Sequence, residues 1–287
     1  MQRLKGRVAV VTGASRNLGR GIALALGKEG ATVYVTGRSI RGKQTQDLPG
    51  ANIKATAEKV TAAGGIGIPV QCDHSVDEEV EALFDRVKQE QGHLEILVNN
   101  AWGGYETITD WSSWGPPFWE QPLSRWDVMS RVGLRSHMTS SYFAAPLMLA
   151  TRRRRRLIVN TTVAMEEAGY PANLFYWLSK VAINRMTTKM AEELRKRRIA
   201  VVALAPGWLR TMHILQSYET DDESAHKISA LQGSESTKYA GRAAVALATD
   251  SKVMEKTGCV LRTRELGPEY GFTDVDGRQP PLDDHSG

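Results

Sequence analysis

The chain has 287 residues, of which 41% are hydrophobic and 24% charged, and its formal net charge is +5. This length suffices for a full hydrophobic core, and the composition excludes a disordered or low-complexity chain. No apolar run approaches a membrane span, and neither the two cysteines nor the six histidines show metal-ligand spacing. We therefore expect a cytoplasmic protein with buried thiols and without a signal peptide, membrane span or metal site.

The first predicted element is a short apolar run, Val8 to Val11, which is typical of a buried parallel strand. It leads into a glycine-containing turn, Thr12 to Gly19, and then into a helical pattern. Gly13 permits a tight turn, while Gly19 and Gly21 keep the start of the helix free of side chains. The unpaired N–H groups and positive dipole end of that helix can then face a pyrophosphate. The turn predicts a dinucleotide cradle; a glycine loop in an unrelated α/β protein is the alternative.

A second buried strand is predicted at Thr32 to Thr36. An acidic residue after this strand would bind the ribose hydroxyls of NAD, whereas a cation accommodates the 2′-phosphate of NADP. The chain has Arg38 here, and Arg16 lies inside the glycine turn. Either arginine alone is more often a surface charge, but together they predict NADP(H).

Strand and helix patterns continue to alternate along the chain. Further strands are predicted over residues 66–72, 94–98, 157–161, 199–205 and 258–262, and helices over 51–63, 76–90, 124–150, 236–249 and around residue 176. This alternation predicts a three-layer, doubly wound Rossmann fold with a central parallel sheet of about seven strands. We expect one domain over residues 1–264, followed by a surface tail over 265–287.

Two segments, one rich in tryptophan and one polar, are predicted to be lids over a substrate site. Five of the seven tryptophans lie between Ala101 and Trp126, in a long stretch without regular periodicity. Because disorder disfavours aromatic residues, we interpret residues 101–125 as an apolar lid over a substrate site. Packing against a neighbouring subunit is the alternative, and the two are compatible. The polar segment 207–233 predicts a second, mobile lid.

Five consecutive arginines, Arg152 to Arg156, hold much of the positive charge. Because no aromatic residues interleave them, a nucleic-acid patch is disfavoured. The pattern favours a solvated helix end, where cations meet the negative end of the helix dipole, and at most a weak anion contact.

Tyr176 and Lys180 are spaced i,i+4, so both lie on one face of a predicted helix. A phenol with an unperturbed pKa near ~10 is a poor acid–base catalyst at neutral pH, and a nearby ammonium lowers that pKa. Such pairs also arise by chance on helix surfaces. This pair lies downstream of the glycine turn and of an Asn-Asn-Ala segment at 99–101, and upstream of Pro206 and Gly207.

This ordered set of motifs resembles the short-chain dehydrogenase/reductase family. The resemblance implies that Tyr176 exchanges a proton with a carbonyl or alcohol, that Lys180 binds the nicotinamide ribose and tunes Tyr176, and that Thr162 is catalytic. It also implies that Asp73 contacts the adenine ring, although a helix N-cap at Asp73 or Ser75 is an alternative role. The predicted cofactor-binding residues are Gly13, Ser15, Arg16, Asn17, Leu18, Gly19, Arg38, Asp73, Asn99, Ala101, Tyr176, Lys180, Pro206, Gly207 and Thr211.

The chain departs from the family's pattern at several positions. Asn17 replaces the middle glycine of the turn, which is tolerable because Asn readily adopts a left-handed backbone. Trp102 replaces the glycine of N-N-A-G. The family's substrate-binding serine corresponds to Thr162, with an uncertainty of one residue either way. Thr161 would also supply a hydroxyl, whereas Val163 would leave no side-chain donor.

The family's helix asparagine, which helps to hold a water for proton relay, aligns best with Arg131. An arginine cannot reproduce the donor and acceptor of an amide, so we expect Arg131 to point to solvent, with Ser130 serving in part. A slower relay or a different substrate geometry would follow.

The resemblance implies an NADPH-dependent oxidoreductase, a carbonyl reductase acting on an apolar ketone or aldehyde. The alternative is an NADP-binding regulatory or scaffold protein with impaired catalysis. Partners expected from the family are a small apolar substrate and further copies of the chain in a homodimer or homotetramer, associated through the long helices that contain Val132 and Tyr176.

Overall fold

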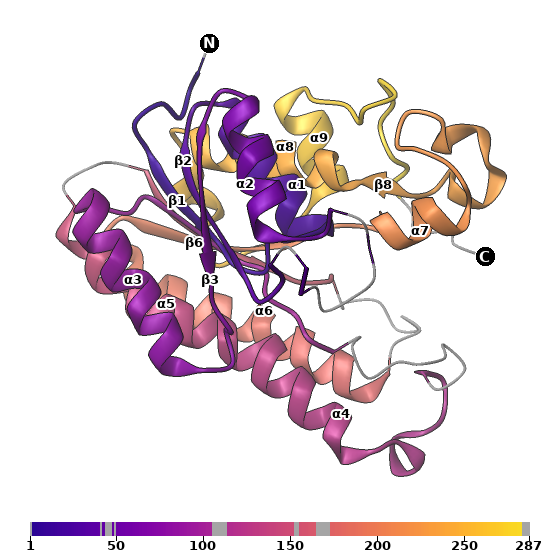
Figure 1. Ribbon diagram of the computed structural model, residues 1–287, viewed down its shortest axis with the longest axis horizontal. Coiled ribbons are helices and arrows are strands. Elements are labelled where there is room, and N and C mark those ends of the chain that lie inside the picture. Colours follow the sequence, from indigo (N-terminus) through magenta and orange to yellow (C-terminus); the bar gives the residue numbers. More distant parts are fainter. Residues whose placement is uncertain are drawn as a thin grey trace.

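The computed structural model describes residues 2–40, 42–43, 48, 50–104, 114–151, 155–164 and 173–282. Helices cover both faces of a central sheet, as the sequence predicts (Figure 1). The strands of that sheet are β1 (Val8–Val11), β2 (Thr32–Gly37), β3 (Ile66–Gln71), β4 (Ile96–Asn99), β5 (Arg156–Thr161), β6 (Ile199–Ala205) and β9 (Val260–Arg262). The α-helices are α1 (Asn17–Lys28), α2 (Ile53–Ala62), α3 (Asp77–Gln91), α4 (Leu123–Val128), α5 (Ser136–Ala150), α6 (Leu174–Arg195), α7 (Met212–Ser217), α8 (Thr237–Thr249) and α9 (Thr263–Tyr270).

The seven strands lie in the order β3-β2-β1-β4-β5-β6-β9, and every neighbouring pair is parallel. The strand order reverses between β1 and β4, where Val10 is in register with both Tyr34 and Leu97. In open parallel sheets, ligands bind in the crevice outside the carboxyl ends of the strands at such a reversal. The topology therefore places a ligand crevice between the end of β1 and the end of β4.

Two apolar layers hold the sheet between its helices. On one face, Ile22 of α1, Ala57 of α2 and Ala243 of α8 pack with strand residues such as Val11. On the other face, residues of α3, α5 and α6 pack with Val10 and its neighbours. Burial on both faces explains why these strands are continuous apolar runs rather than alternating ones.

The glycines of α1 have two different structural roles. A β-carbon at Gly21 would lie 2.3 Å from the carbonyl oxygen of Thr237, and one at Gly241 would lie 2.6 Å from the carbonyl oxygen of Gly21. Gly21 therefore permits close packing between α1 and α8. This differs from the sequence interpretation, which assigned it to the pyrophosphate cradle together with Gly19.

Two predicted elements differ from the observed ones. The helix expected over residues 124–150 consists of α4, a π-helical segment, Met129–Arg135, and α5. The surface tail expected over residues 265–287 is wrong for its described part, because it begins within α9, whose Leu266 is buried, and continues to the buried Asp274. Residues 283–287 lie outside the described part.

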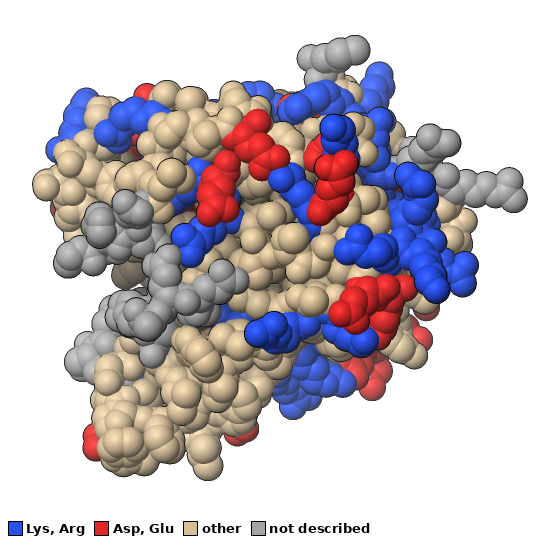
Figure 2. Space-filling view, turned by 180° about the vertical axis from the view of Figure 1, so that it is seen from behind, with Lys and Arg blue, Asp and Glu red and all other residues tan. Residues whose placement is uncertain are grey.

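A short second sheet, β7 (Leu209–Arg210) with β8 (Glu235–Ser236), lies beyond the carboxyl end of β6. At the lower end of the molecule in Figure 1, the part that carries α4 is mostly uncharged on the face in Figure 2. Its exposed apolar side chains are Phe118, Trp119 and Leu123.

Candidate active site

The glycine turn is tied to the end of β4 by a set of hydrogen bonds. Thr12 Oγ1 accepts from the backbone N–H of Asn100 at 2.8 Å and of Ala101 at 2.9 Å. The Asn100 side chain donates to the carbonyl oxygens of Thr12 and Gly13 at 2.9 and 3.1 Å. A β-carbon at Gly13 would lie 2.8 Å from Ala101 Cα, and one at Gly19 would lie 2.4 Å from Asn100 Nδ2. Both positions therefore require glycine.

Asn17 has the left-handed backbone expected for it, with a φ of 48°. It is the first residue of α1, and its Oδ1 accepts from the backbone N–H of Met212 at 3.0 Å. Asn17 thus joins the turn to the start of α7, a contact that the sequence did not reveal. Ser15 is buried beneath the turn, and Arg16 and Leu18 are half-buried beside it.

The structure assigns Asn99 a different role from the predicted one. Its side chain is fully buried and donates at 2.8 Å to both Ser141 Oγ and Asn160 Oδ1. Asn99 therefore links β4 to α5 and β5 inside the molecule rather than offering an amide to a cofactor. Asn100 is the asparagine that contacts the turn, and sequence reasoning missed it because the two adjacent asparagines cannot be distinguished before their directions are known.

Arg38 and Asp73 lie opposite each other at the ends of β2 and β3. Arg38 Nη1 lies 3.9 Å from Asp73 Oδ2, and both side chains are partly exposed. Burial opposes the ionisation of Asp73, but hydrogen bonds from Ser75 and the nearby Arg38 outweigh it and lower the pKa of this carboxyl. The N-cap residue of α3 is Val76, so neither Asp73 nor Ser75 caps that helix.

Tyr176 and Lys180 project together from α6, as their spacing predicts. The helix starts at an Asn173 cap, whose Oδ1 accepts from the Phe175 N–H at 2.9 Å. Both Tyr176 and Lys180 are 8% exposed. Burial lowers the pKa of the Lys180 ammonium to about 8. Tyr176 packs edge-to-face against Trp114, with ring centroids 5.6 Å apart.

The segment after β5 includes Thr162 and Val163, whose side chains have different surroundings. Val163 packs against the apolar cluster that contains Tyr176. The Thr162 hydroxyl instead donates to Asn184 Oδ1 at 2.7 Å. The same hydroxyl lies 3.3 Å from the Lys180 carbonyl oxygen, so Thr162 contacts α6 close to the Tyr–Lys pair, and its catalytic role stays a prediction. Thr161, at the end of β5, is buried as well.

The helix segment before α5 also differs from the prediction. Arg131 points outward, as expected, and its Nε donates to the Ser75 carbonyl oxygen at 3.3 Å. The Ser130 hydroxyl donates to the Trp126 carbonyl oxygen at 2.8 Å, so it does not serve the site. Gly133 of the same segment lies against the Trp102 ring, because a β-carbon there would lie 2.3 Å from a ring atom.

The loop after β6 lies over a buried polar cluster. A β-carbon at Gly207 would lie 2.4 Å from Arg264 Nε. Arg264 in turn lies 3.7 Å from Glu235 Oε2, and the Thr263 hydroxyl contacts both Glu235 oxygens at 2.8 Å. Burial raises the pKa of the Glu235 carboxyl to about 8. The loop with Pro206 and Gly207 therefore packs on a buried cluster of polar side chains, which no short sequence motif revealed.

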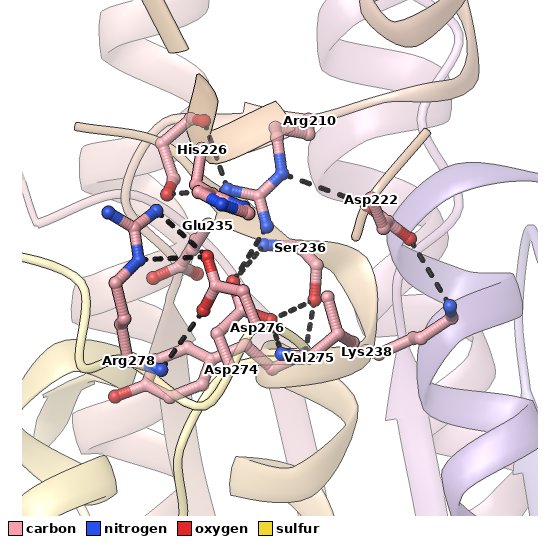
Figure 3. Close-up of polar contacts among 12 residues, drawn as sticks. Arg210, Asp222, His226, Glu235, Ser236, Lys238, Asp274, Val275, Asp276 and Arg278 are labelled. Atoms are coloured by element: carbon pink, nitrogen blue, oxygen red, sulfur yellow. Dashed lines mark hydrogen bonds and ion pairs between the residues drawn. The ribbon is translucent and has the colours of Figure 1, made fainter. Parts of the chain in front are cut away.

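The second predicted lid is anchored by Arg210 and the C-terminal segment (Figure 3). Arg210 Nη2 donates to Asp274 Oδ2 at 2.8 Å, and Nη1 donates to the Ser234 carbonyl oxygen at 2.8 Å. Asp274 also accepts from the backbone N–H of Ser236 at 2.8 Å. Thr211 caps α7 through a hydrogen bond from the Ile214 N–H at 3.4 Å. The network joins β7, β8 and the chain beyond α9.

The described arginines of the run, Arg155 and Arg156, precede and begin β5 and donate to carbonyl oxygens at the ends of helices. Arg156 donates to the Met148 carbonyl oxygen in the last turn of α5 at 2.8 Å, and Arg155 donates to that of Thr249 at the end of α8 at 3.1 Å. Arg152 to Arg154, and residues 105–113 of the first lid with Trp111, lie outside the described residues. Over the residues that are described, no cluster of three or more metal-binding side chains occurs, and no helix is long and apolar enough to cross a membrane.

A parallel seven-stranded sheet, a glycine turn at its reversal point and a buried Tyr–Lys pair define a nucleotide-dependent oxidoreductase fold. Residues 7–222 match the family model described as short chain dehydrogenase, and the chain belongs to this family. It is 36% identical to the human protein "Dehydrogenase/reductase SDR family member 1", over 98% of this chain and 87% of that protein.

Solved structures agree with this assignment. A putative dehydrogenase from Xanthomonas campestris superposes with a TM-score of 0.78 and is 26% identical, covering 98% of this chain and 95% of its own. A metagenomic short-chain oxidoreductase in complex with NADP superposes with a TM-score of 0.69 at 27% identity, covering 91% of this chain and 98% of its own. The family match confirms the predicted resemblance and the Rossmann fold.

Proposed function

We propose that this chain is an NADP(H)-dependent oxidoreductase that transfers hydride between the nicotinamide and a carbonyl or alcohol, and that it works as a carbonyl reductase on apolar ketones or aldehydes. The observation that carries the proposal is the buried pair of Tyr176 and Lys180. Trp102 packs on both side chains and directly follows Ala101, whose N–H is hydrogen-bonded to Thr12 at the glycine turn. The bound dinucleotide supplies the hydride, so the protein has to hold it and exchange one proton.

The residues around the crevice fit a dinucleotide. Gly13 and Gly19 leave backbone where any β-carbon would collide with β4, and α1 starts there with its positive dipole end. Arg16 and Arg38 add positive charge at the places where the 2′-phosphate of NADP would lie. Leu18, Asp73 and the loop of Pro206, Gly207 and Thr211 complete the proposed binding residues.

The Tyr176 hydroxyl is the proposed donor of the proton to a carbonyl oxygen, or its acceptor in the reverse direction. An ammonium at Lys180 favours the phenolate, and the pKa of Lys180 near 8 keeps it mostly protonated at neutral pH. Positioned acid–base groups of this kind contribute roughly 10²- to 10⁴-fold to the rate. Lys180 would also bind the nicotinamide ribose.

The surroundings of Tyr176 favour an apolar substrate. Trp114 and Trp102 pack against its ring, and Val163 packs on the same cluster. These side chains offer a hydrophobic wall and, in Val163, no hydroxyl for the substrate oxygen. Tyr176 then becomes the principal side-chain donor to that oxygen. Residues 101–125 and 207–233 remain the proposed lids.

Val163 also motivates the second candidate, an NADP-binding regulatory or scaffold protein with impaired catalysis. Both candidates bind NADPH, but only the first requires the Tyr176 hydroxyl. We further propose a cytoplasmic homo-oligomer. Cys72 and Cys259 are both free thiols, but only Cys72 is buried as expected, and Cys259 is exposed. The exposed face of α5 presents Tyr142 and other apolar side chains, which further copies of the chain would cover.

The test is NADPH consumption over a panel of apolar ketones, aldehydes, quinones and steroids, with wild type and Tyr176→Phe side by side. We expect the variant to lose turnover by about 10²-fold or more and to bind NADPH as wild type does. Tyr142→Phe, at an exposed tyrosine of α5, is the matched control. Tight NADPH binding without any Tyr176-dependent turnover would instead favour the regulatory protein.

A further inference from the structure

The ring of Trp102 lies directly against both members of the Tyr–Lys pair. Trp102 follows β4 after Ala101, and its ring centroid is 4.4 Å from Lys180 Nζ. The same ring packs edge-to-face on Tyr176, with centroids 5.2 Å apart and planes at 79°. Lys180 Nζ is also 5.6 Å from the Tyr176 ring centroid. The ammonium therefore lies within reach of two aromatic faces.

Two glycines make room for the Trp102 ring. A β-carbon at Gly133, in the π-helical segment, would lie 2.3 Å from Cζ3 of Trp102, and one at Gly104 would lie 2.8 Å from Cζ2. Real β-carbons do not approach ring atoms this closely, so a side chain at 133 would displace the ring. The indole and the helix that faces it are thus matched in shape.

An aromatic ring is a suitable neighbour for the buried ammonium of Lys180. A lysine side chain is flexible and strongly hydrated, and burial opposes its charge. An indole face attracts an ammonium without offering it a hydrogen-bond acceptor or a competing charge. A further titratable group near Lys180 is His137 of α5, whose pKa is held well below its usual value first by burial and then by the Lys180 charge. His137 is therefore neutral at physiological pH.

We propose that Trp102 is a positioning residue that holds the Lys180 ammonium beside Tyr176 and keeps water away from the pair, and that Gly133 is required because it admits the indole. The catalytic consequence rests on the proposed function, since it acts through Lys180 and Tyr176. The placement of the ammonium does not, and it can be measured without turnover.

The experiment measures how readily Lys180 reacts with an amine-specific anhydride as a function of pH, read out by mass spectrometry of the Lys180 peptide in the full-length protein. Wild type is expected to show a midpoint near pH 8. In Trp102→Ala, losing the indole face removes an attraction that favours the ammonium, whereas access of water removes the desolvation that lowers its pKa. Because desolvation is the cause of the lowered pKa, we expect the midpoint to rise. Trp102→Phe retains an aromatic face and should stay close to wild type.

Trp177→Ala is the matched control, because Trp177 lies on the same helix next to Tyr176 but is 37% exposed. Its Lys180 midpoint should not move. If Trp102→Ala does not fold, Gly133→Ala displaces the ring without deleting it and should produce the same rise. An unchanged midpoint in a folded ring-deleted or ring-displaced variant overturns the proposal.

Turnover separates this proposal from the proposed function. If wild type is an active reductase, Trp102→Ala should lower kcat and shift its pH profile in step with the labelling midpoint, and Trp102→Phe should restore both. A labelling shift without any wild-type turnover would support the positioning role and contradict the reductase. Turnover with a wild-type pH profile in Trp102→Ala would contradict the positioning role alone.

Discussion

Replacing Asp274 by alanine should loosen the base of the second lid and destabilise the whole protein. The substitution removes the acceptor for Arg210 Nη2 at 2.8 Å and for the Ser236 N–H at 2.8 Å. The Arg210 side chain is 1% exposed, so its charge would remain buried. Breaking a buried pair in this way costs roughly 3–5 kcal/mol. Because Asp222 Oδ1 still lies 3.7 Å from Arg210 Nε, we expect about 3 kcal/mol, at the low end of that range.

Urea unfolding of Asp274→Ala and wild type measures the loss, and amide hydrogen exchange locates it. Exchange should accelerate first in β7 and β8. Glu269→Ala is the control, because its ion pair with Lys256 is partly exposed and is expected to contribute about 0–1 kcal/mol. The double variant Arg210→Met/Asp274→Leu should recover part of the stability, because it removes both members of the buried pair. The recovery is incomplete, because the Ser236 N–H still loses its acceptor and Asp222 keeps only Lys238 of its two ion-pair partners. A loss below about 1 kcal/mol with unchanged exchange would refute the reasoning.

Three further outcomes are expected. The Glu235 carboxyl has a pKa of about 8 in the folded protein, above its usual 4.5, so between these two values the folded state binds more protons than the unfolded state. The free energy of unfolding should therefore fall as pH rises through this interval. Urea unfolding at pH 5, 6.5 and 8 should show a smaller fall for Glu235→Gln than for wild type. Arg38→Asp should weaken NADPH binding by about tenfold or more and favour NADH, as measured by fluorescence titration; equal NADPH affinity would exclude a phosphate contact. Asn17→Ala should lower the free energy of unfolding by about 1–2 kcal/mol, because alanine adopts a positive φ less readily than asparagine. Asn17→Gly should retain more stability. Thermal melts that place the two variants in the reverse order would contradict this.

The local parts of the molecule could be predicted from the sequence. Buried parallel strands are short apolar runs, and helices repeat their apolar residues every 3.6 positions, so the alternation predicted the sheet and its helices. The i,i+4 spacing placed Tyr176 and Lys180 on one helix face, and the positive φ of Asn17 follows from its place in the turn. Each of these features depends on residues close together in the chain.

The directions of individual side chains depended on the tertiary structure. A shift of one residue reverses the direction of a side chain along a strand, which is why Asn99 points inward. In the segment after β5, the Thr162 hydroxyl binds Asn184, whereas Val163 packs on the apolar cluster that contains Tyr176. On the helical segment before α5, the local winding directs Gly133 toward the Trp102 ring.

Contacts across long stretches of chain were also decided by the tertiary structure alone. Asp274 binds Arg210, and the ring of Trp102 fills the space left by Gly133 before it reaches Lys180. A sequence motif records spacing along the chain, whereas these partners are separated by tens of residues and meet only when the layers pack. The sequence by itself therefore determined the class of fold and the presence of a Tyr–Lys pair, and packing determined what surrounds that pair.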